Sequence, residues 1–309
     1  MAQQRFEDLG IGTKASESRL RLLNRDGTFN VRRKGLPFLK WFSGYHFLIS
    51  LSWSKFNLLI LVAYVAINAA FGGIYLLIGT NGLSGIDGHT LTGRYIESFF
   101  FSTQTFTTVG FGKVAPEGMA ANIVASFESL SGLLFFALAT GLLYGRFSRP
   151  IAKIIFSRNA VVAPYQNITA FMFRSANQRT NQLIDVGATV TLSRLEHTES
   201  GERTRKFYTL DLERNAVALF YLSWTVVHPI TESSPLFGVT KEQLEESDAE
   251  FLILLKAFDD SFSQYVHART SYKSHEVIFG QKFKGIIRAA PDGMTELDLG
   301  KIHEFEKEG

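Results

Sequence analysis

Hydrophobic residues are concentrated in two long runs, with shorter mixed patterns elsewhere along the chain. The first run, 56–78, contains no charged residue over 23 positions. At about 1.5 Å of rise per residue it forms roughly 35 Å of helix, enough to cross a bilayer core of about 30 Å. The second run, 122–144, is apolar apart from Glu128. Both runs are predicted to be membrane-spanning helices.

A shorter helical pattern lies between the two spans. Residues 94–106 have the periodicity of a helix, but this length gives only about 20 Å, too short to cross. A Gly-rich connector, 79–93, precedes it, and the stretch "TTVGFGK" (107–113) follows. We therefore expect a helix that enters the membrane part-way and an irregular loop after it.

Residues 37–52 are predicted to form an amphipathic helix ahead of the first span. Phe38, Trp41 and Tyr45 recur at three- and four-residue steps. This segment is too short to cross, so it suits a slide helix lying in the membrane interface. A helix docked on a soluble domain would show the same pattern, and both interpretations stay open. Residues 1–36 lack periodicity and a secretory signal and are expected to form an N-terminal cytoplasmic tail.

Beyond residue 150 the apolar pattern changes to a period of two. Runs such as "ITAFMFR" (168–174) and "LFYLSWTVVH" (219–228) are separated by turn signals. Many short strands of this kind predict an all-β sandwich. We expect a transmembrane pore domain at 53–150 and a cytoplasmic β-sandwich domain at 151–309.

Charge and composition narrow the function class. Residues 56–145 hold six charged residues in ninety positions, whereas charged residues make up 20% of the chain. The absence of cysteine excludes disulfides and thiolate metal sites. The seven histidines show no metal-ligand spacing, and no Ser-His-Asp order with a nucleophile elbow is present. We expect no enzyme and no cofactor, and the net charge of +3 makes no case for nucleic acid.

The basic residues predict the orientation. Ten precede the first span, two lie between the spans, and the second span is followed at once by Arg146, Arg149, Lys153 and Arg158. Because positive residues favour the cytoplasmic side, both termini are expected inside and 79–121 outside. The predicted location is the bacterial inner membrane, with two passes.

The sequence Thr108-Val109-Gly110-Phe111-Gly112 is the strongest functional signal. Irregular backbone at membrane depth must be buried in protein or line a watery path. Glycine lets successive carbonyls turn to one side, and four such strands would form rings that replace the water shell of K⁺, as in the "TVGYG" loop of potassium channels. We expect K⁺ to bind at Thr108, Val109, Gly110 and Phe111. Two spans per chain cannot enclose a pore, so a homotetramer is expected.

The chain resembles the prokaryotic inward-rectifier potassium channels, the KirBac family, from about residue 24 to its end. The resemblance implies a tetramer with a slide helix, outer helix, pore helix, filter and inner helix, followed by an immunoglobulin-like cytoplasmic domain. Phe111 departs from the commoner tyrosine and loses a hydroxyl hydrogen bond. The matching stretches are "NRDGTFNV" (24–31), "YHFLISLSW" (45–53), "STQTFTTVGFG" (102–112), "GLLYGRFSRP" (141–150), "LSWTVVHPITESSPLFG" (222–238) and "HARTSYKSHEVIFG" (267–280).

The resemblance also assigns roles on the second span. Gly132 matches the inner-helix hinge, although small-residue packing would explain it equally. Phe136, Thr140 and Tyr144 share one helical face, and Phe136 and Tyr144 match positions that line and close the conduction path. Tyr144 could instead face lipid. The resemblance also implies that strong eukaryotic rectifiers carry an acid, which attracts blocking polycations, at the position of Phe136, so weak polyamine block is expected here.

Two polar residues are expected to support the filter. Glu128 lies inside a span and needs a partner, which we expect to be a threonine or a backbone group of the pore helix. Its replacement by glutamine is therefore expected to destabilise the filter. Gln104, four residues before Thr108, is expected either to cap the pore helix or to contact the filter.

Four basic residues are expected to meet anionic lipid headgroups at about 1 kcal/mol each: Lys55, Arg146, Arg149 and Lys153. The resemblance implies a phosphoinositide-type site here, while topology marking alone would give the same pattern. The sequence thus predicts a passive potassium channel gated at the inner-helix bundle by the cytoplasmic domain and lipid. A membrane-anchored β-sandwich sensor and a non-selective pore are the alternatives.

Overall fold

The computed structural model describes residues 21–32, 34–35, 43–79, 82–148, 152–197, 201 and 203–307, and the backbone of 5–6. The chain divides into two compact units. We call Gly35–Arg149 the membrane unit, and Met1–Lys34 with Pro150–Gly309 the β unit. Each is described by itself.

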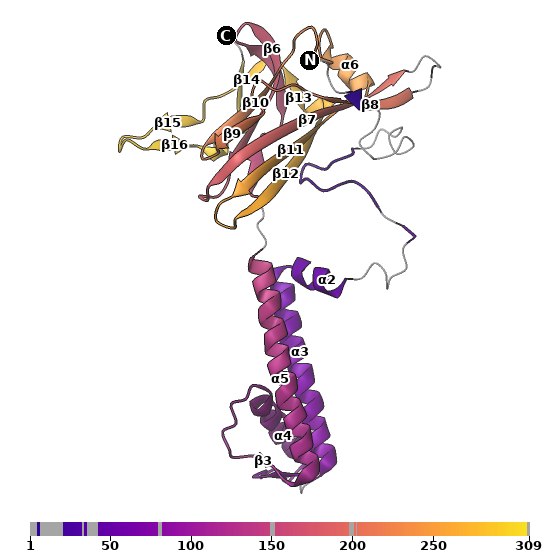
Figure 1. The fold of residues 1–309 in the computed structure, drawn as a ribbon, viewed down its shortest axis with the longest axis vertical. Helices are drawn as coiled ribbons and strands as arrows, with labels where there is room; N and C mark the ends of the chain where they lie inside the picture. The colour runs from indigo at the N-terminus through magenta and orange to yellow at the C-terminus, as the bar shows by residue number, and fades with distance from the viewer. Residues whose placement is uncertain are drawn as a thin grey trace. The chain divides into compact units, whose positions relative to one another are not determined.

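The membrane unit is helical, and Figure 1 shows its two long helices side by side. A short β2–β3 ribbon closes the loops around α4. The elements are α2 (Gly44–Ser50), α3 (Trp53–Ile78), β2 (Leu83–Ser84), α4 (Leu91–Phe106), β3 (Ala115–Pro116) and α5 (Gly118–Phe147). Helices α3 and α5 are both long and apolar enough to cross a membrane.

The helix bounds extend beyond the apolar runs that predicted them. Helix α3 begins three residues before the run at 56–78, and α5 extends the run at 122–144 at both ends. The reason is that polar terminal turns remain helical while they leave the hydrocarbon. Of the slide helix expected at 37–52, the structure has α2, with the Ser43 side chain accepting from His46 N. Residues 37–42 lie outside the described part.

Two short-range features set the ends of the half-length helix α4. Thr90 caps its first turn by accepting from Gly93 N. At the other end the chain leaves the helix after Phe106, and Thr107 N donates to Thr103 O. With 16 residues, α4 is about 24 Å long, shorter than the hydrocarbon core.

The β unit is a two-sheet sandwich, which confirms the predicted fold class. One sheet has the order β1-β8-β7-β11-β12, with β9 on β7; the other has the order β10-β6-β5-β13, with β4 on β6. The strands of the first are β1 (Arg5–Phe6), β7 (Leu183–His197), β8 (Arg203–Thr209), β9 (Ala216–Leu219), β11 (Glu250–Asp259) and β12 (Gln264–Lys273). Those of the second are β4 (Ile154–Phe156), β5 (Ala160–Tyr165), β6 (Ile168–Asn177), β10 (Ser223–Pro229) and β13 (Val277–Phe279).

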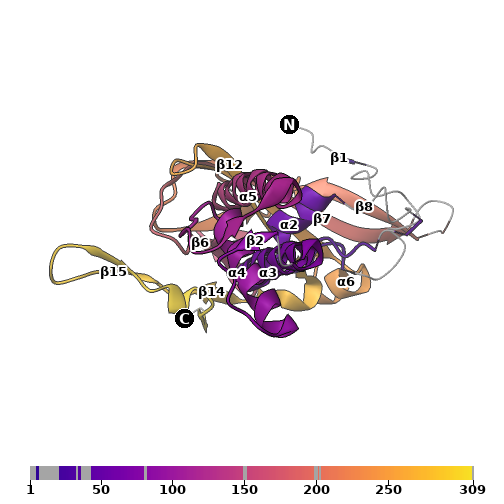
Figure 2. The same ribbon diagram turned by 90° about the horizontal axis from the view of Figure 1, so that it is seen from below.

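Smaller elements decorate the sandwich. These elements are α6 (Lys241–Glu246), η2 (Ser274–Glu276), the pair β14 (Gln281–Phe283) and β17 (Phe305–Lys307), the pair β15 (Ile287–Ala289) and β16 (Thr295–Leu297), and η3 (Leu299–Lys301). The hairpin formed by β15 and β16 projects from the sandwich in both views (Figure 1, Figure 2).

The core lies between the two sheets and follows the period-two pattern. On β11 the buried positions Phe251, Ile253 and Leu255 alternate with the exposed Leu254 and Lys256. Phe251 stacks on Phe171 of the facing sheet with ring centroids 4.1 Å apart. Burial of one such aromatic side chain contributes about 1.5–3 kcal/mol, so these rows hold the sheets together.

An N-terminal segment of the β unit is tied to the sandwich by buried carboxylates. Glu276 receives Arg21 Nη1 at 3.0 Å and Nη2 at 2.9 Å, and Arg25 Nε at 2.8 Å. Glu250, fully buried, accepts the backbone N–H groups of Leu22 and Leu23. Burial alone would raise the pKa of Glu276, but the hydrogen bonds from Arg21, the Lys273 backbone and Arg25 outweigh it and lower the pKa.

Replacing Glu276 by glutamine is expected to destabilise the β unit by about 3 kcal/mol, because Arg21 and Arg25 lose a buried partner. The lowered pKa means that this stabilisation is complete above the ordinary carboxyl pKa of 4.5 and disappears as pH falls through the lower folded value. The melting temperature of the purified full-length protein, followed from pH 7 downward, measures both effects.

The matched control is Glu306→Gln, which breaks the half-exposed pair with Lys282. Exposed pairs contribute less than about 1 kcal/mol, so this variant should melt close to the original protein. Equal melting of Glu276→Gln and the original protein across the pH range would contradict the proposed anchoring.

Candidate functional site

The loop after α4 has alternating backbone conformation at the predicted filter. Thr108, Gly110 and Gly112 have φ of 59°, 53° and 82°, whereas Val109 and Phe111 are not among the positive-φ residues. Positive φ is uncommon for a side chain such as threonine and is readily adopted by glycine. Alternation of this kind turns successive peptide groups so that their carbonyls point to the same side.

Gln104 holds this loop in two ways. Its backbone carbonyl accepts Val109 N at 2.9 Å, and its side-chain Oε1 accepts Phe111 N at 3.3 Å. The sequence left helix capping and filter contact open for Gln104. The structure shows both contacts. The backbone carbonyl of Gln104 accepts a hydrogen bond at the end of the helix, and its side-chain amide oxygen accepts one from Phe111.

A polar network links three helices behind the loop. Glu128 on α5 is fully buried, and accepts Tyr75 Oη of α3 at 2.7 Å and Ser102 Oγ of α4. Ser102 Oγ also lies 3.1 Å from Asn68 Oδ1, and Asn68 Nδ2 donates to Tyr64 O at 2.7 Å. The predicted threonine or backbone partner of Glu128 is therefore wrong: the partners are two hydroxyls, one from the outer helix.

Counting protons changes the expectation for Glu128. The Ser102 hydroxyl has one proton but faces two oxygens, Asn68 Oδ1 and Glu128 Oε1. The Asn68 amide cannot be reversed, because its nitrogen is bound to Tyr64 O. The set of hydrogen bonds is complete when Glu128 carries a proton and donates to Ser102, which then donates to Asn68.

Asn68, Tyr75 and Ser102 were not singled out from the sequence. Their signal was present, because a polar side chain in an apolar span is costly and needs a partner. What the sequence could not supply was the pairing, since the residues joined by each of these three hydrogen bonds are 26 to 53 positions apart in the chain.

Gly132 lies where α5 crosses the end of α4. A Cβ atom placed on it would stand 2.0 Å from Phe106 O, so only glycine fits. Phe106 is fully buried, with Tyr64, Phe135 and Phe136 rings around it at 5.5–6.4 Å. This geometry supplies the packing reason for Gly132, and its role as a hinge stays a prediction.

The predicted gate residues lie on exposed helix surface in the single chain. Phe136 is 47% exposed and Tyr144 is 74% exposed, and Thr140 is also exposed. The ring of Phe136 lies 6.4 Å from that of Phe106 at the end of α4, whereas Tyr144 lies two turns further along α5.

Arg146 is bound to the protein instead of standing open to a headgroup. Its Nη1 donates to Leu48 O at 2.8 Å and its Nη2 to Leu51 O at 2.7 Å, at the end of α2. The guanidinium lies over the rings of Trp53 and Phe56 at 4.7 and 4.5 Å. We therefore leave Arg146 out of the lipid proposal.

The other three predicted lipid contacts do not share one described unit. Lys55 is exposed on the membrane unit and Lys153 is exposed on the β unit. Arg149 lies outside the described residues.

Two family profiles match the chain. Residues 154–308 match the inward rectifier potassium channel C-terminal domain, and residues 59–149 match the ion channel family. The chain is also 39% identical to the inward rectifier potassium channel Kirbac3.1 of Paramagnetospirillum magnetotacticum, over 95% of this chain and 98% of that protein. The chain belongs to the inward rectifier potassium channel family.

More distant inward rectifiers are similar over shorter shares of their length. Human inward rectifier potassium channel 18 is 26% identical over 77% of this chain and 59% of its own. Mouse G protein-activated inward rectifier potassium channel 3 is 26% identical over 93% of this chain and 77% of its own. The chain thus spans less than two thirds of the human channel.

The proton count predicts how this inward rectifier responds to changes at Glu128. Glu128→Gln keeps an oxygen for Tyr75 and an N–H for Ser102, so we expect its stability within about 1 kcal/mol of the original. Glu128→Ala leaves the buried Tyr75 hydroxyl without an acceptor, removes the group that donates to Ser102 and leaves a small cavity, so it should cost about 2–4 kcal/mol. Thermal dissociation of the purified channel in detergent measures both.

Glu117→Gln is the control, because Glu117 is exposed at the start of α5 and makes no side-chain cap. If glutamine at 128 proves as damaging as alanine, the carboxyl is ionised and the proton assignment is wrong. The sequence alone predicts that second outcome, a destabilising Glu128→Gln.

Proposed function

We propose that this chain is the subunit of a tetrameric inward-rectifier channel that conducts K⁺ passively through the Thr108–Gly112 loop. The observation that carries the proposal is the alternating backbone of that loop, held to α4 by both groups of Gln104. Carbonyl rings of this kind replace the hydration shell of K⁺. Membership of the inward rectifier potassium channel family supports the choice of ion.

The exposed apolar residues of the membrane unit support the tetramer. Val109 and Phe111 are 55% and 80% exposed in the single chain, although they belong to the loop that follows the C-terminal end of the half-length helix α4. Four chains around one axis would cover this loop and the face of Phe136 and Tyr144. Two spans alone cannot enclose a path for an ion.

Gating is proposed to pass through the contact between α2 and α5. Arg146 fastens α5 to the last carbonyls of α2, and Tyr45 Oη lies 2.8 Å from where a Cβ on Gly145 would stand. Movement of α2 would therefore be transmitted to the C-terminal end of α5. The segment around Arg21, which is anchored to the β unit, precedes α2 in the chain, so we propose that a change in the β unit acts on α2.

Anionic lipid is proposed to contribute to gating through Lys55, Lys153 and Arg149. The first two are exposed, and bases beside a membrane attract anionic headgroups by about 1 kcal/mol each. We place the channel in the bacterial inner membrane with both termini inside, from the distribution of its basic residues.

Rubidium flux into liposomes tests the proposal. The purified channel should carry rubidium, barium should block it, and reversal potentials should favour K⁺ over Na⁺. Flux is compared with and without anionic lipid. Gly110→Ala is the control, because Gly110 has φ of 53° and alanine is strained there, so flux should fall at least about tenfold.

Absence of flux in every lipid mixture would favour a membrane-anchored sensor instead. Flux without selectivity would indicate that Phe111 leaves the filter too loose. Phe111→Tyr, which restores the missing hydroxyl, should then recover K⁺ selectivity.

Voltage-dependent block by spermine tests the assignment of Phe136 to the conduction path. The original channel should show weak block, because Phe136 offers no charge to a polycation. Phe136→Asp introduces four carboxylates in a tetramer and should strengthen block by about tenfold or more. Phe136→Asn, similar in size but uncharged, is the control, and steep block of the original channel at micromolar spermine would refute the assignment.

A further inference from the structure

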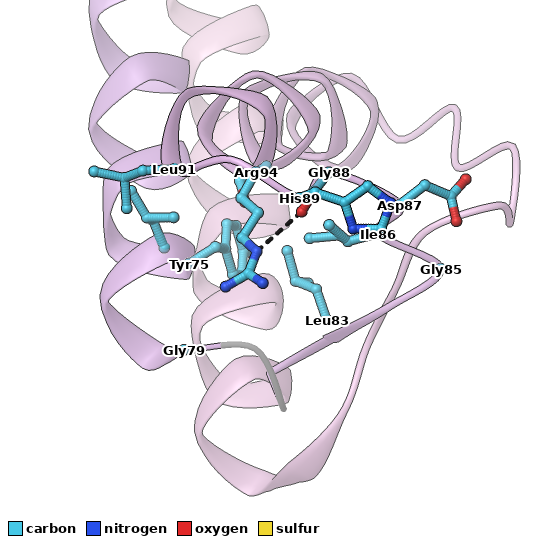
Figure 3. A pocket seen from close by; sticks show the side chains of 12 residues that line it. Tyr75, Gly79, Leu83, Gly85, Ile86, Asp87, Gly88, His89, Leu91 and Arg94 are labelled. Carbon is cyan, nitrogen blue, oxygen red and sulfur yellow. Dashed lines mark hydrogen bonds between the residues drawn. The ribbon is translucent and has the colours of Figure 1, made fainter.

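A cavity of about 440 Å³ lies in the membrane unit where α3 ends and α4 begins (Figure 3). Its wall includes the last turn of α3, the loop at 83–89 and the first turns of α4. None of these residues belongs to the proposed filter, gate or lipid contacts. The cavity combines an apolar wall of Leu76, Leu83 and Leu91 with one guanidinium, that of Arg94.

Arg94 is held in position with most of its donors unused. Its Nε donates to Gly88 O at 3.0 Å, which orients the planar group. Figure 3 shows the guanidinium between Tyr75 and Leu83, pointing into the cavity. Neither of its Nη atoms forms a hydrogen bond or an ion pair with another residue in the described part of the chain.

The acids near Arg94 are engaged elsewhere. Asp87 pairs with Lys113 at 3.1 Å, and Figure 3 shows its carboxylate turned away from the guanidinium. Glu97 accepts the backbone N–H groups of Asp87 at 2.9 Å and Gly88 at 3.2 Å. The first turn of α4 contains no acidic residue. The N-terminal end of a helix favours a negative charge, yet the charged side chain here is the guanidinium of Arg94. The guanidinium of Arg94 therefore has free donors that an anion from outside the chain could accept.

The position of the cavity relative to the bilayer indicates which kind of anion it would meet. Helix α3 has 26 residues and is about 39 Å long, so its last turn reaches beyond a hydrocarbon core of about 30 Å into the headgroup layer. A guanidinium with two free Nη atoms suits a phosphate, which it can bind with two parallel hydrogen bonds. The leucines beside it suit the glycerol and the first methylenes of an acyl chain.

We propose that this cavity binds the phosphodiester headgroup of an anionic phospholipid. Arg94 donates to the phosphate oxygens, and Leu76, Leu83 and Leu91 contact the apolar part of the lipid. The site lies at the opposite end of α3 from Lys55, so it is separate from the lipid contacts proposed for gating.

Native mass spectrometry of the purified full-length channel, titrated with phosphatidylglycerol, tests the site. The titrations use a Lys55→Gln, Lys153→Gln background, which reduces binding at the other end of the spans. Arg94→Gln should weaken phosphatidylglycerol binding about fivefold. Lys282→Gln, which removes a half-exposed base of the β unit, should leave it unchanged.

Leu91→Glu is the second variant, because Leu91 is 74% exposed and its replacement leaves the bond from Arg94 to Gly88 in place. The added carboxylate at the mouth of the cavity should repel the headgroup and weaken binding to a similar extent. This variant decides the question if Arg94→Gln fails to fold.

Unchanged phosphatidylglycerol binding in Arg94→Gln, or in Leu91→Glu if the former does not fold, would overturn the proposal. Glycerol 3-phosphate and phosphatidylcholine are the comparison ligands, and both should bind more weakly. Equal binding of glycerol 3-phosphate would mean that the site takes a free phosphate, which also overturns it. Ion flux plays no part in the assay, so this result and the conduction test fail independently.

Discussion

Irregular backbone inside a hydrocarbon layer must have a partner for every polar group, and the membrane unit is organised around that constraint. Helix α4 ends half-way, and the loop after it exposes peptide groups that no helix satisfies. Gln104 supplies two of the missing acceptors, one from its backbone and one from its side chain. In the proposed channel the remaining carbonyls would replace the water shell of a cation.

The distance between helices follows from the same constraint. Glu128 draws α3 and α4 toward α5 through Tyr75 and Ser102, so the polar atoms of three helices are satisfied together. Gly72 and Gly132 make that approach possible. A Cβ on Gly72 would lie 3.0 Å from Phe99 Cα, and one on Gly132 would overlap Phe106 O. The hydrogen bonds of Glu128 thus form only because the two glycines let the helices approach closely.

Buried charges also connect segments that are distant in the chain of the β unit. Glu276 and Glu250 hold the residues around Arg21 against β12 and η2, more than 220 positions away. Removal of either carboxylate would leave buried donors unpaired, which costs more than the pair itself contributes. Arg146 does the same in the membrane unit, where it binds the carbonyls at the end of α2. In both units charged side chains join a segment that lies earlier in the chain to the packed body.

Local properties of the sequence were enough to predict the two spans, the half-length helix, the glycine-rich loop and the period-two sandwich. Each depends on the hydrophobicity, length and backbone freedom of neighbouring residues. Three features could be identified only from the tertiary structure. They are the hydrogen-bond partners of Glu128, the binding of Arg146 to the carbonyls at the end of α2, and the close contact of Phe106 that requires glycine at 132. Ser102 and Tyr75 are ordinary polar residues until helix packing places them beside Glu128. The sequence determined which groups would need partners, and packing decided which partners they met, because burial and distance are properties of the folded chain alone.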